Sequence, residues 1–127
     1  MSATLSPCPC GGTDYAHCCG RYHSGTPAPD AVTLMRSRYS AYVLKLENYL
    51  LATWHPDTRP ASLDLASDNA KWLGLEVEQY IPESADRATV EFVARYKIGG
   101  RAHRLHEVSR FVREDGRWFY VDGAFPE

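Results

Sequence analysis

Cysteine is the residue type whose placement in this chain points most directly to chemistry. All four cysteines fall within twelve consecutive positions, in the stretch "CPCGGTDYAHCCGRYH" that runs from Cys8 to His23. Cys8 and Cys10 can bind one ion together if the chain turns sharply between them. Pro9 and the Gly11-Gly12 pair favour such a turn, and the glycines leave backbone N–H groups free to approach the sulfurs.

A second cysteine pair completes a set of metal ligands. Cys18 and Cys19 follow Cys10 after seven intervening residues, and four thiolates can form the tetrahedral site that Zn²⁺ prefers when it is structural. Such a site leaves no open coordination position, so the zinc would fold the N-terminal segment rather than catalyse a reaction. His17 and His23 are alternative ligands, each able to replace one cysteine.

Three other kinds of chemistry can use four cysteines. Disulfides are disfavoured because a bond between the neighbouring Cys18 and Cys19 would be strained. They are also disfavoured because the N-terminus shows no signal peptide, and we expect a cytoplasmic protein whose thiols stay reduced. A redox pair usually has the spacing C-x-x-C, which the sequence lacks. An iron–sulfur cluster also needs four thiolates and is not distinguished by their number.

The composition is that of a folded domain rather than a disordered chain. Of 127 residues, 44% are hydrophobic and 24% are charged, and the fifteen aromatic residues can build a core or line a pocket. A net charge of −2 excludes a general basic field that would attract nucleic acid. No stretch approaches the roughly 18 apolar residues of a membrane span, so we expect no membrane partner.

The distribution of Gly, Pro and hydrophobic residues predicts three segments. Residues 1–25 lack an amphipathic period and form a small metal module that cannot build a core of its own. Residues 26–29 form a linker stiffened by proline, and residues 30–127 form the main domain. We expect the module and the domain to fold independently, so that a Cys8→Ser change would unfold the module alone.

The main domain is predicted to begin with helices. Asp30 is a good N-cap, because its carboxylate can accept free backbone N–H groups of the following turn. A second short helix, "NYLLATW", should stop near Trp54, since Pro56 disfavours a helical conformation in the residue before it. The stretch "SDNAKW" predicts a further short helix capped by Ser67 or Asp68. The first helix carries one buried stripe: Ala31, Met35, Tyr39, Tyr42 and Leu46.

From residue 73 onward the period of the hydrophobic residues changes to two. Four strands are predicted, "LGLEVEQY", "RATVEFVARYKI", "RAHRLHEVSRFVRE" and "RWFYVDG". Gly99-Gly100 and Asp115-Gly116 are two-residue turns that supply the positive φ angles needed by hairpins. Helices followed by an antiparallel meander define an α+β fold.

The two hairpin turns also fix which residues face each other. Phe92 should face Glu107 across the first turn, and Phe111 should face Tyr120 across the second. One face of the sheet is then aromatic and apolar and should receive the helices: Phe92, Ala94, Tyr96, Leu105, Phe111, Trp118 and Tyr120.

Three polar residues, Glu107, Ser109 and Asp122, share this face in the predicted register, and a single bulge would invert the assignment beyond it. A carboxylate in an apolar layer costs several kcal/mol unless it is hydrogen-bonded or protonated. Glu107 therefore either belongs to a functional pocket or sits near the rim of the sheet. A third alternative is a pair with an arginine such as Arg38 of the first helix.

Two parts of the sequence resemble known families. "CPCGG" followed by "YAHCCG" resembles the SEC-C motif, best known from the zinc tail of the bacterial preprotein translocase ATPase. The motif implies Cys8, Cys10, Cys18 and Cys19 as ligands, although this chain is one residue shorter between the second and the third. "LMRSRYSAYVL", "YLLATWHP" and "HEVSRFVREDGRWFYVDG" resemble the bacterial YchJ-like family, which joins a SEC-C motif to a cone-shaped domain like nuclear transport factor 2 (NTF2).

The resemblance implies a pocket between the helices and the sheet, which relatives of the fold use for isomerisation, dehydration or ligand binding. A histidine and a carboxylate at one mouth can act as acid and base, whereas a histidine before a proline is more often a surface or capping residue. No G-x-S-x-G, P-loop or dinucleotide fingerprint occurs. The candidates for pocket chemistry are His55, Glu107, Asp122, Arg38 and Tyr42.

Two classes of function follow. By resemblance, the expected function is a zinc-binding adaptor that holds one structural Zn²⁺ and docks a protein partner on its SEC-C module. A ribosome or nucleic-acid partner has little support, because only Arg21 and His23 form a small basic-aromatic patch beside the metal. The alternative is a small-molecule binder or an acid–base enzyme that acts in the cone. An apolar cone enclosing Glu107 or Asp122 beside His55, with space for a ligand, favours the alternative, and a filled cone favours the adaptor.

Overall fold

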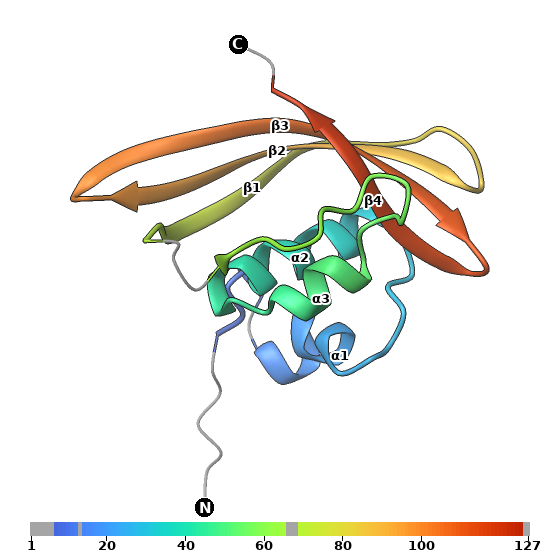
Figure 1. Ribbon diagram of the computed structural model, residues 1–127, viewed down its shortest axis with the longest axis horizontal. Helices are drawn as coiled ribbons and strands as arrows, with labels where there is room; N and C mark the ends of the chain where they lie inside the picture. Colours follow the sequence, from blue (N-terminus) through green and yellow to red (C-terminus); the bar gives the residue numbers. More distant parts are fainter. Residues whose placement is uncertain (1–6, 13, 66–68, 126–127) are drawn as a thin grey trace, which may run out of the picture.

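A curved antiparallel sheet covered on one face by helices makes up most of the molecule (Figure 1). The computed structural model describes residues 7–12, 14–65 and 69–125. The sheet has four strands in the order β1-β2-β3-β4, so each strand pairs with its neighbour in sequence. The elements in chain order are η1 (Tyr15–His17), α1 (Cys19–His23), α2 (Ala31–Leu44), α3 (Glu47–Ala52), β1 (Lys71–Pro82), β2 (Arg87–Ile98), β3 (Arg101–Glu114) and β4 (Arg117–Ala124).

Helix α2 begins where the sequence predicts. The side chain of Asp30 accepts a hydrogen bond from the backbone N–H of Thr33 at 2.8 Å, which confirms the N-cap. The helix ends at Leu44, because Lys45 adopts a left-handed conformation with a φ of 60°. The predicted stripe faces inward along most of its length, since Ala31, Met35 and Tyr39 are buried.

The second helix is shorter than predicted, and the third is not formed where the structure describes the chain. Helix α3 ends at Ala52, because Trp54 forms an isolated bridge with Tyr120 of β4 instead of continuing the helix. The proposed caps Ser67 and Asp68 lie outside the described residues. The prediction is wrong for residues 71 and 72, which already belong to β1.

The strands and turns follow the sequence prediction closely. All four turn residues of the two hairpins have positive φ angles, between 53° and 80°: Gly99, Gly100, Asp115 and Gly116. The register is also confirmed, with Phe92 opposite Glu107 and Phe111 opposite Tyr120. The fold is therefore α+β, with helices first and an antiparallel meander after them.

The core lies between α2 and the aromatic face of the sheet. Phe92, Ala94, Phe111 and Trp118 are buried there, as predicted, together with Leu34 and Met35 of the helix. Figure 1 shows α2 directly beneath the sheet and α1 on the far side of α2. Helix α2 is thus enclosed between the sheet and the N-terminal module.

A bulge near the end of β4 corrects one prediction. Phe111 pairs with Tyr120 but Arg110 pairs with Asp122, so Val121 is an extra residue in β4. Beyond it the two faces exchange. Asp122 lies on the outer face with Arg110 rather than on the aromatic face, and the residue that faces inward beside the Glu107 carboxylate is Gly123.

Candidate functional site

A tight loop brings the first two cysteines to one side of the chain. The backbone N–H of Gly11 donates to the carbonyl of Cys8 at 3.0 Å, and the N–H of Cys8 donates to the carbonyl of Gly12 at 3.1 Å. Gly11 has a φ of 105°, a conformation that favours glycine. At Gly12 even a methyl group would lie 2.7 Å from the sulfur of Cys18, so the glycine is required by the close approach of the second cysteine pair.

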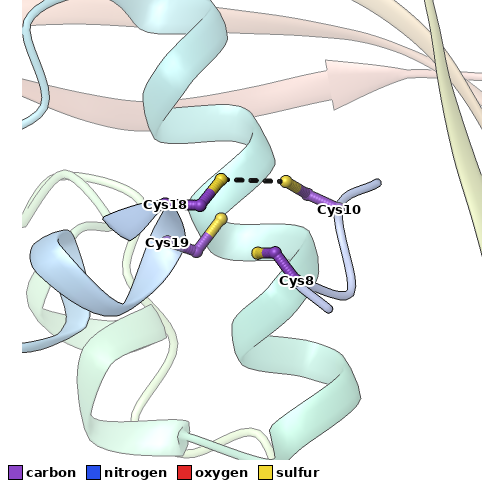
Figure 2. Close-up of side chains that lie close together, drawn as sticks. All are labelled: Cys8, Cys10, Cys18 and Cys19. Carbon is purple, nitrogen blue, oxygen red and sulfur yellow. Dashed lines mark hydrogen bonds between the residues drawn. The ribbon is translucent and has the colours of Figure 1, made fainter. Parts of the chain in front are cut away.

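The second pair stands at the start of α1, directly across from this loop. The sulfur atoms of Cys8, Cys10, Cys18 and Cys19 all lie within 4.8 Å of one another. Figure 2 shows the side chains pointing toward one common centre from the loop and from α1, next to helix α2. The sulfurs of Cys10 and Cys18 are 3.6 Å apart.

This arrangement fits a tetrahedral metal ion. Zn–S bonds of about 2.3 Å in a tetrahedron separate the sulfurs by about 3.8 Å. The observed span of up to 4.8 Å therefore needs only a small contraction to surround an ion. The four cysteines are a donor set that could bind a metal, with every position supplied by the protein.

The four thiols differ in how readily they ionise. A hydrogen bond from Cys19, supported by the other sulfurs, lowers the pKa of Cys10 to about 5. Burial and the hydrogen bond with Cys10 raise the pKa of Cys18 to about 11. The cluster by itself thus carries one thiolate readily, and a cation at its centre would stabilise the others as thiolates.

The two histidines considered as alternative ligands point elsewhere. His17 is 84% exposed and its Nδ1 interacts with the carboxylate of Asp14. His23 has both ring nitrogens occupied, with Nδ1 2.6 Å from the hydroxyl of Tyr15 and Nε2 2.8 Å from the carbonyl of Ser37. Neither belongs to the group of clustered donors.

The module packs tightly onto the main domain. The hydroxyl of Ser40, in the middle of α2, donates to the sulfur of Cys19 at 3.2 Å and lies 3.6 Å from that of Cys8. Cys8, Cys10 and Cys19 belong to the same buried core as the sheet residues. This shared core argues against the independent folding that the sequence suggested.

A second feature is a cavity of about 230 Å³ between α2 and the sheet. It is the pocket implied by the family resemblance, and it is neither filled nor purely apolar. Two charged residues enter it from different walls, Arg38 from the helix and Glu107 from the sheet. Its lining is otherwise mostly aromatic or apolar, and consists of Met35, Tyr39, Tyr42, Trp72, Phe92, Ala94, Leu105, Ser109, Phe111 and Tyr120.

Arg38 is 5% exposed and is anchored by the neighbouring helix. Its Nη1 donates to the carbonyl of Leu50 at 2.8 Å and to the hydroxyl of Thr53 at 2.7 Å. The guanidinium also lies over the rings of Tyr120 and Trp54, at 4.6 and 5.1 Å from their centroids. Burial lowers the pKa of Arg38, and the surrounding tyrosines and Glu107 oppose that shift.

Glu107 is 8% exposed and is supported by hydroxyl groups. Its Oε2 accepts hydrogen bonds from Ser109 at 2.6 Å and from Tyr120 at 3.1 Å. Burial and the proximity of Glu107 raise the pKa of Tyr120. Of the interpretations offered by the sequence, the structure places Glu107 in the pocket rather than at the rim, and it forms no contact ion pair with Arg38.

Of the other three residues predicted for the pocket, one lines the cavity and two lie elsewhere. Tyr42 lines the cavity together with Arg38 and Glu107. His55 lies in a different, polar hollow, where its Nε2 is 2.8 Å from the carboxylate of Glu114. Asp122 binds Arg110 on the outer face, and its side chain is 45% exposed. The acid–base combination of His55 with a carboxylate at the cone mouth is therefore not assembled.

Some residues of both sites were not singled out from the sequence. Tyr120 was assigned to the core and Ser40 was not considered, yet Tyr120 supports Glu107 and Ser40 contacts two cysteines. A signal for Ser40 exists, because Ser37 and Ser40 are small polar residues one turn apart that flank the predicted buried stripe. The role of Gly123 depends on the bulge and has no local signal.

The fold and the cysteine cluster together define a class, a SEC-C module packed on an NTF2-like cone. The family model described as "YchJ, middle NTF2-like domain" matches residues 30–123. A UPF0225 protein of Methylibium petroleiphilum is 63% identical over 119 residues, which cover 92% of this chain and 87% of that protein. The chain belongs to the YchJ-like (UPF0225) family.

Two solved structures are similar over nearly their whole length. A SEC-C motif containing protein from Rhodopseudomonas palustris has a TM-score of 0.84 at 35% identity, covering 96% of this chain and all of that one. A SEC-C motif containing protein from Psychrobacter arcticus has a TM-score of 0.81 at 30% identity, covering all of this chain and 86% of that one. Within the described ranges, no helix has the length and apolar character needed to cross a membrane.

Proposed function

We propose that this protein binds a small molecule in its cone cavity, and that its cysteine cluster holds one structural Zn²⁺. The observation that carries the proposal is the cavity itself, in which a buried arginine and a buried carboxylate face free space between aromatic walls. Structural polar groups in a filled core usually satisfy each other directly. Few, fixed polar groups in an otherwise apolar cavity are typical of ligand sites.

The zinc supports this function from outside the cavity. Four thiolates leave no position open for substrate, so the ion would stabilise the module rather than perform chemistry. Ser40 contacts the cluster and directly follows the cavity-lining Arg38 and Tyr39 in α2, so the ion would also hold in place the helix that forms one wall of the cavity.

Native mass spectrometry of the protein purified from cells tests both parts. The expected spectrum shows one zinc per chain and a retained small molecule that is lost on denaturation. The matched pair of variants is Phe92→Trp, which adds bulk inside the cavity, and Phe119→Trp, which makes the same change at a strand position outside its lining. Retention of the molecule by Phe92→Trp, or its absence from every preparation, would contradict binding in the cavity.

Docking of a protein on the module is a second candidate function. It is supported by an exposed side of α1, where Arg21 lies over the ring of Tyr22 at 5.3 Å. Affinity capture with the zinc-loaded chain should recover a partner that an Arg21→Glu variant loses and an Arg36→Glu variant keeps. Equal recovery by both variants would exclude this surface.

A further inference from the structure

Arg38 and Glu107, the two charged residues of the cavity, each have polar atoms that form no hydrogen bond with the described residues. Arg38 is held through Nη1 only, and its Nε and Nη2 donate to none of the residues that the structure describes. These two N–H groups form the edge with which an arginine binds two acceptors at once. Arg110 uses the same two atoms to bind Asp122 on the outer face, so the chain itself shows what this edge can do.

Glu107 has a free acceptor in the same way. Both of its described hydrogen bonds, from Ser109 and Tyr120, end on Oε2. Oε1 accepts no hydrogen bond from the described part of the chain, and Glu107 lines the cavity. An occupant of the cavity thus meets donors on the helix wall and an acceptor on the sheet wall.

The fixed charges of the cavity already balance. Arg38 contributes one positive charge and Glu107 one negative charge, and among the described residues lining the cavity no other is a carboxylate, lysine or arginine. An anionic ligand would gain from Arg38 but be repelled by Glu107, and a cationic ligand would meet the reverse. In a poorly solvated space either mismatch weakens binding strongly.

The size and shape of the cavity further restrict the chemical class of the ligand. A cavity of about 230 Å³ is smaller than most drug-binding pockets, which suits a molecule of about one ring. Its walls carry the flat faces or edges of Tyr39, Tyr42, Trp72 and Phe92. Aromatic walls of this kind pack best against a planar occupant.

We propose that the cavity binds a neutral planar molecule that carries a carbonyl and an N–H side by side, as carboxamides, lactams and nucleobases do. Its carbonyl accepts from Nε and Nη2 of Arg38, and its N–H donates to Oε1 of Glu107. The inference rests on the proposed small-molecule function and specifies the chemistry of the ligand.

Three probes that share a phenyl ring and differ in charge test it: benzamide, benzoate and benzylamine. Their affinities are measured at pH 7 by isothermal titration calorimetry on the full-length, zinc-loaded protein, with toluene as an uncharged probe that lacks polar groups. Benzamide should bind at least tenfold more tightly than benzoate, benzylamine or toluene. Equal or tighter binding of benzoate or benzylamine would overturn the inference.

A charge-neutralising variant sharpens the test. In Glu107→Gln the repulsion of anions is removed, so benzoate should gain at least tenfold in affinity and become the preferred probe. The matched control is Glu91→Gln, which neutralises a carboxylate of the neighbouring strand that pairs with His106 and does not line the cavity. Its probe preferences should equal those of the wild type. An unchanged preference in Glu107→Gln would overturn the assigned role of Glu107.

The outcomes separate this inference from the proposed function. If toluene binds as tightly as benzamide, the cavity binds small molecules without recognising their polar groups. The inference about ligand chemistry is then wrong, and the proposed function stands. If none of the four probes binds and the protein from cells retains no ligand, the proposed function fails as well.

Discussion

The cysteine cluster and the cone cavity are built in opposite ways. The cluster takes its four sulfurs from twelve consecutive residues, and its closed geometry brings them within 4.8 Å of one another. The cavity takes its polar groups from α2 and from the hairpin of β3 and β4, which lies far from α2 in the sequence, and leaves space between them. In the cysteine cluster the ligand atoms are supplied to one another's centre and can serve only structure. In the cavity, polar groups from separate elements remain available to a ligand.

Helix α2 is the element that both regions share. Ser40 contacts the cysteines, and the adjacent Tyr39 and Arg38 line the cavity. The contrast between the two regions is therefore one of construction and not of physical separation. Because both regions contact α2, a change in either one should alter the stability of the other, by amounts that differ from one change to the next.

Removal of the proposed zinc should have the largest effect. Three of the four cysteines belong to the common core, so a chelator strong enough to strip zinc should destabilise the cone as well as the module. We expect a loss of several kcal/mol and a Tm lower by on the order of 10 °C. Near-UV circular dichroism during thermal melting, with and without chelator, measures it. An unchanged melting curve of the tryptophan signal would restore the independent folding that the sequence suggested.

Gly123→Ala should have the next largest effect. A methyl group there would collide with the Glu107 carboxylate, so the variant must displace that side chain or the strand, at a cost of about 1–3 kcal/mol. Gly74→Ala is the matched control, because a methyl group at Gly74 meets nothing within 4 Å. Urea denaturation of both variants decides the matter, and equal midpoints would show that Glu107 is not held over Gly123.

Ser40→Ala should weaken the proposed metal site without abolishing it. The variant removes the hydroxyl contacts to Cys19 and Cys8, and loss of such outer contacts lowers metal affinity by roughly 10–100-fold. Ser37→Ala is the control, since the hydroxyl of Ser37 bonds to the carbonyl of Leu34 and to Tyr49 and not to sulfur. Competition titrations with a colorimetric zinc chelator compare them. Equal affinities would remove Ser40 from the site.

Asp122→Asn should have the smallest effect, although Asp122 was placed beside Glu107 by the sequence. Arg110 holds the pKa of Asp122 below its ordinary value of 3.8, so the pair stabilises the fold above that pH and loses this contribution as pH falls through the lowered pKa. Because the pair is exposed, the variant should be indistinguishable from wild type at pH 7. A clear loss of stability at pH 7 would show that the bulge of β4 is misassigned.

The sequence predicts what is local or periodic. The N-cap at Asp30, the hairpin turns and the pairing of Phe92 with Glu107 depend on short-range chemistry and on the two-residue period of strands. The four clustered cysteines were recognisable for the same reason, since a short loop can bring them together without the rest of the fold.

The features that the sequence could not predict depend on one inserted residue or on contacts between residues that are distant in the sequence. The extra residue Val121 exchanges the faces of β4, which removes Asp122 from the cavity and brings in Gly123. The docking of the module depends on contacts such as that of His23 with the carbonyl of Ser37, across fourteen positions. Such contacts have no periodic signature, and only the folded chain reveals them.

The enclosure of α2 bears on how this family can vary. Of the residues in α2 only Leu44 is exposed, because the sheet covers one side of the helix and the module covers the other. An ordinary surface helix tolerates substitutions along its solvent side, and α2 has almost none. In a saturation-mutagenesis experiment scored by solubility, Ala31–Leu44 should emerge as the least tolerant segment of the chain, with polar Ser37 and Ser40 as restricted as the apolar residues beside them.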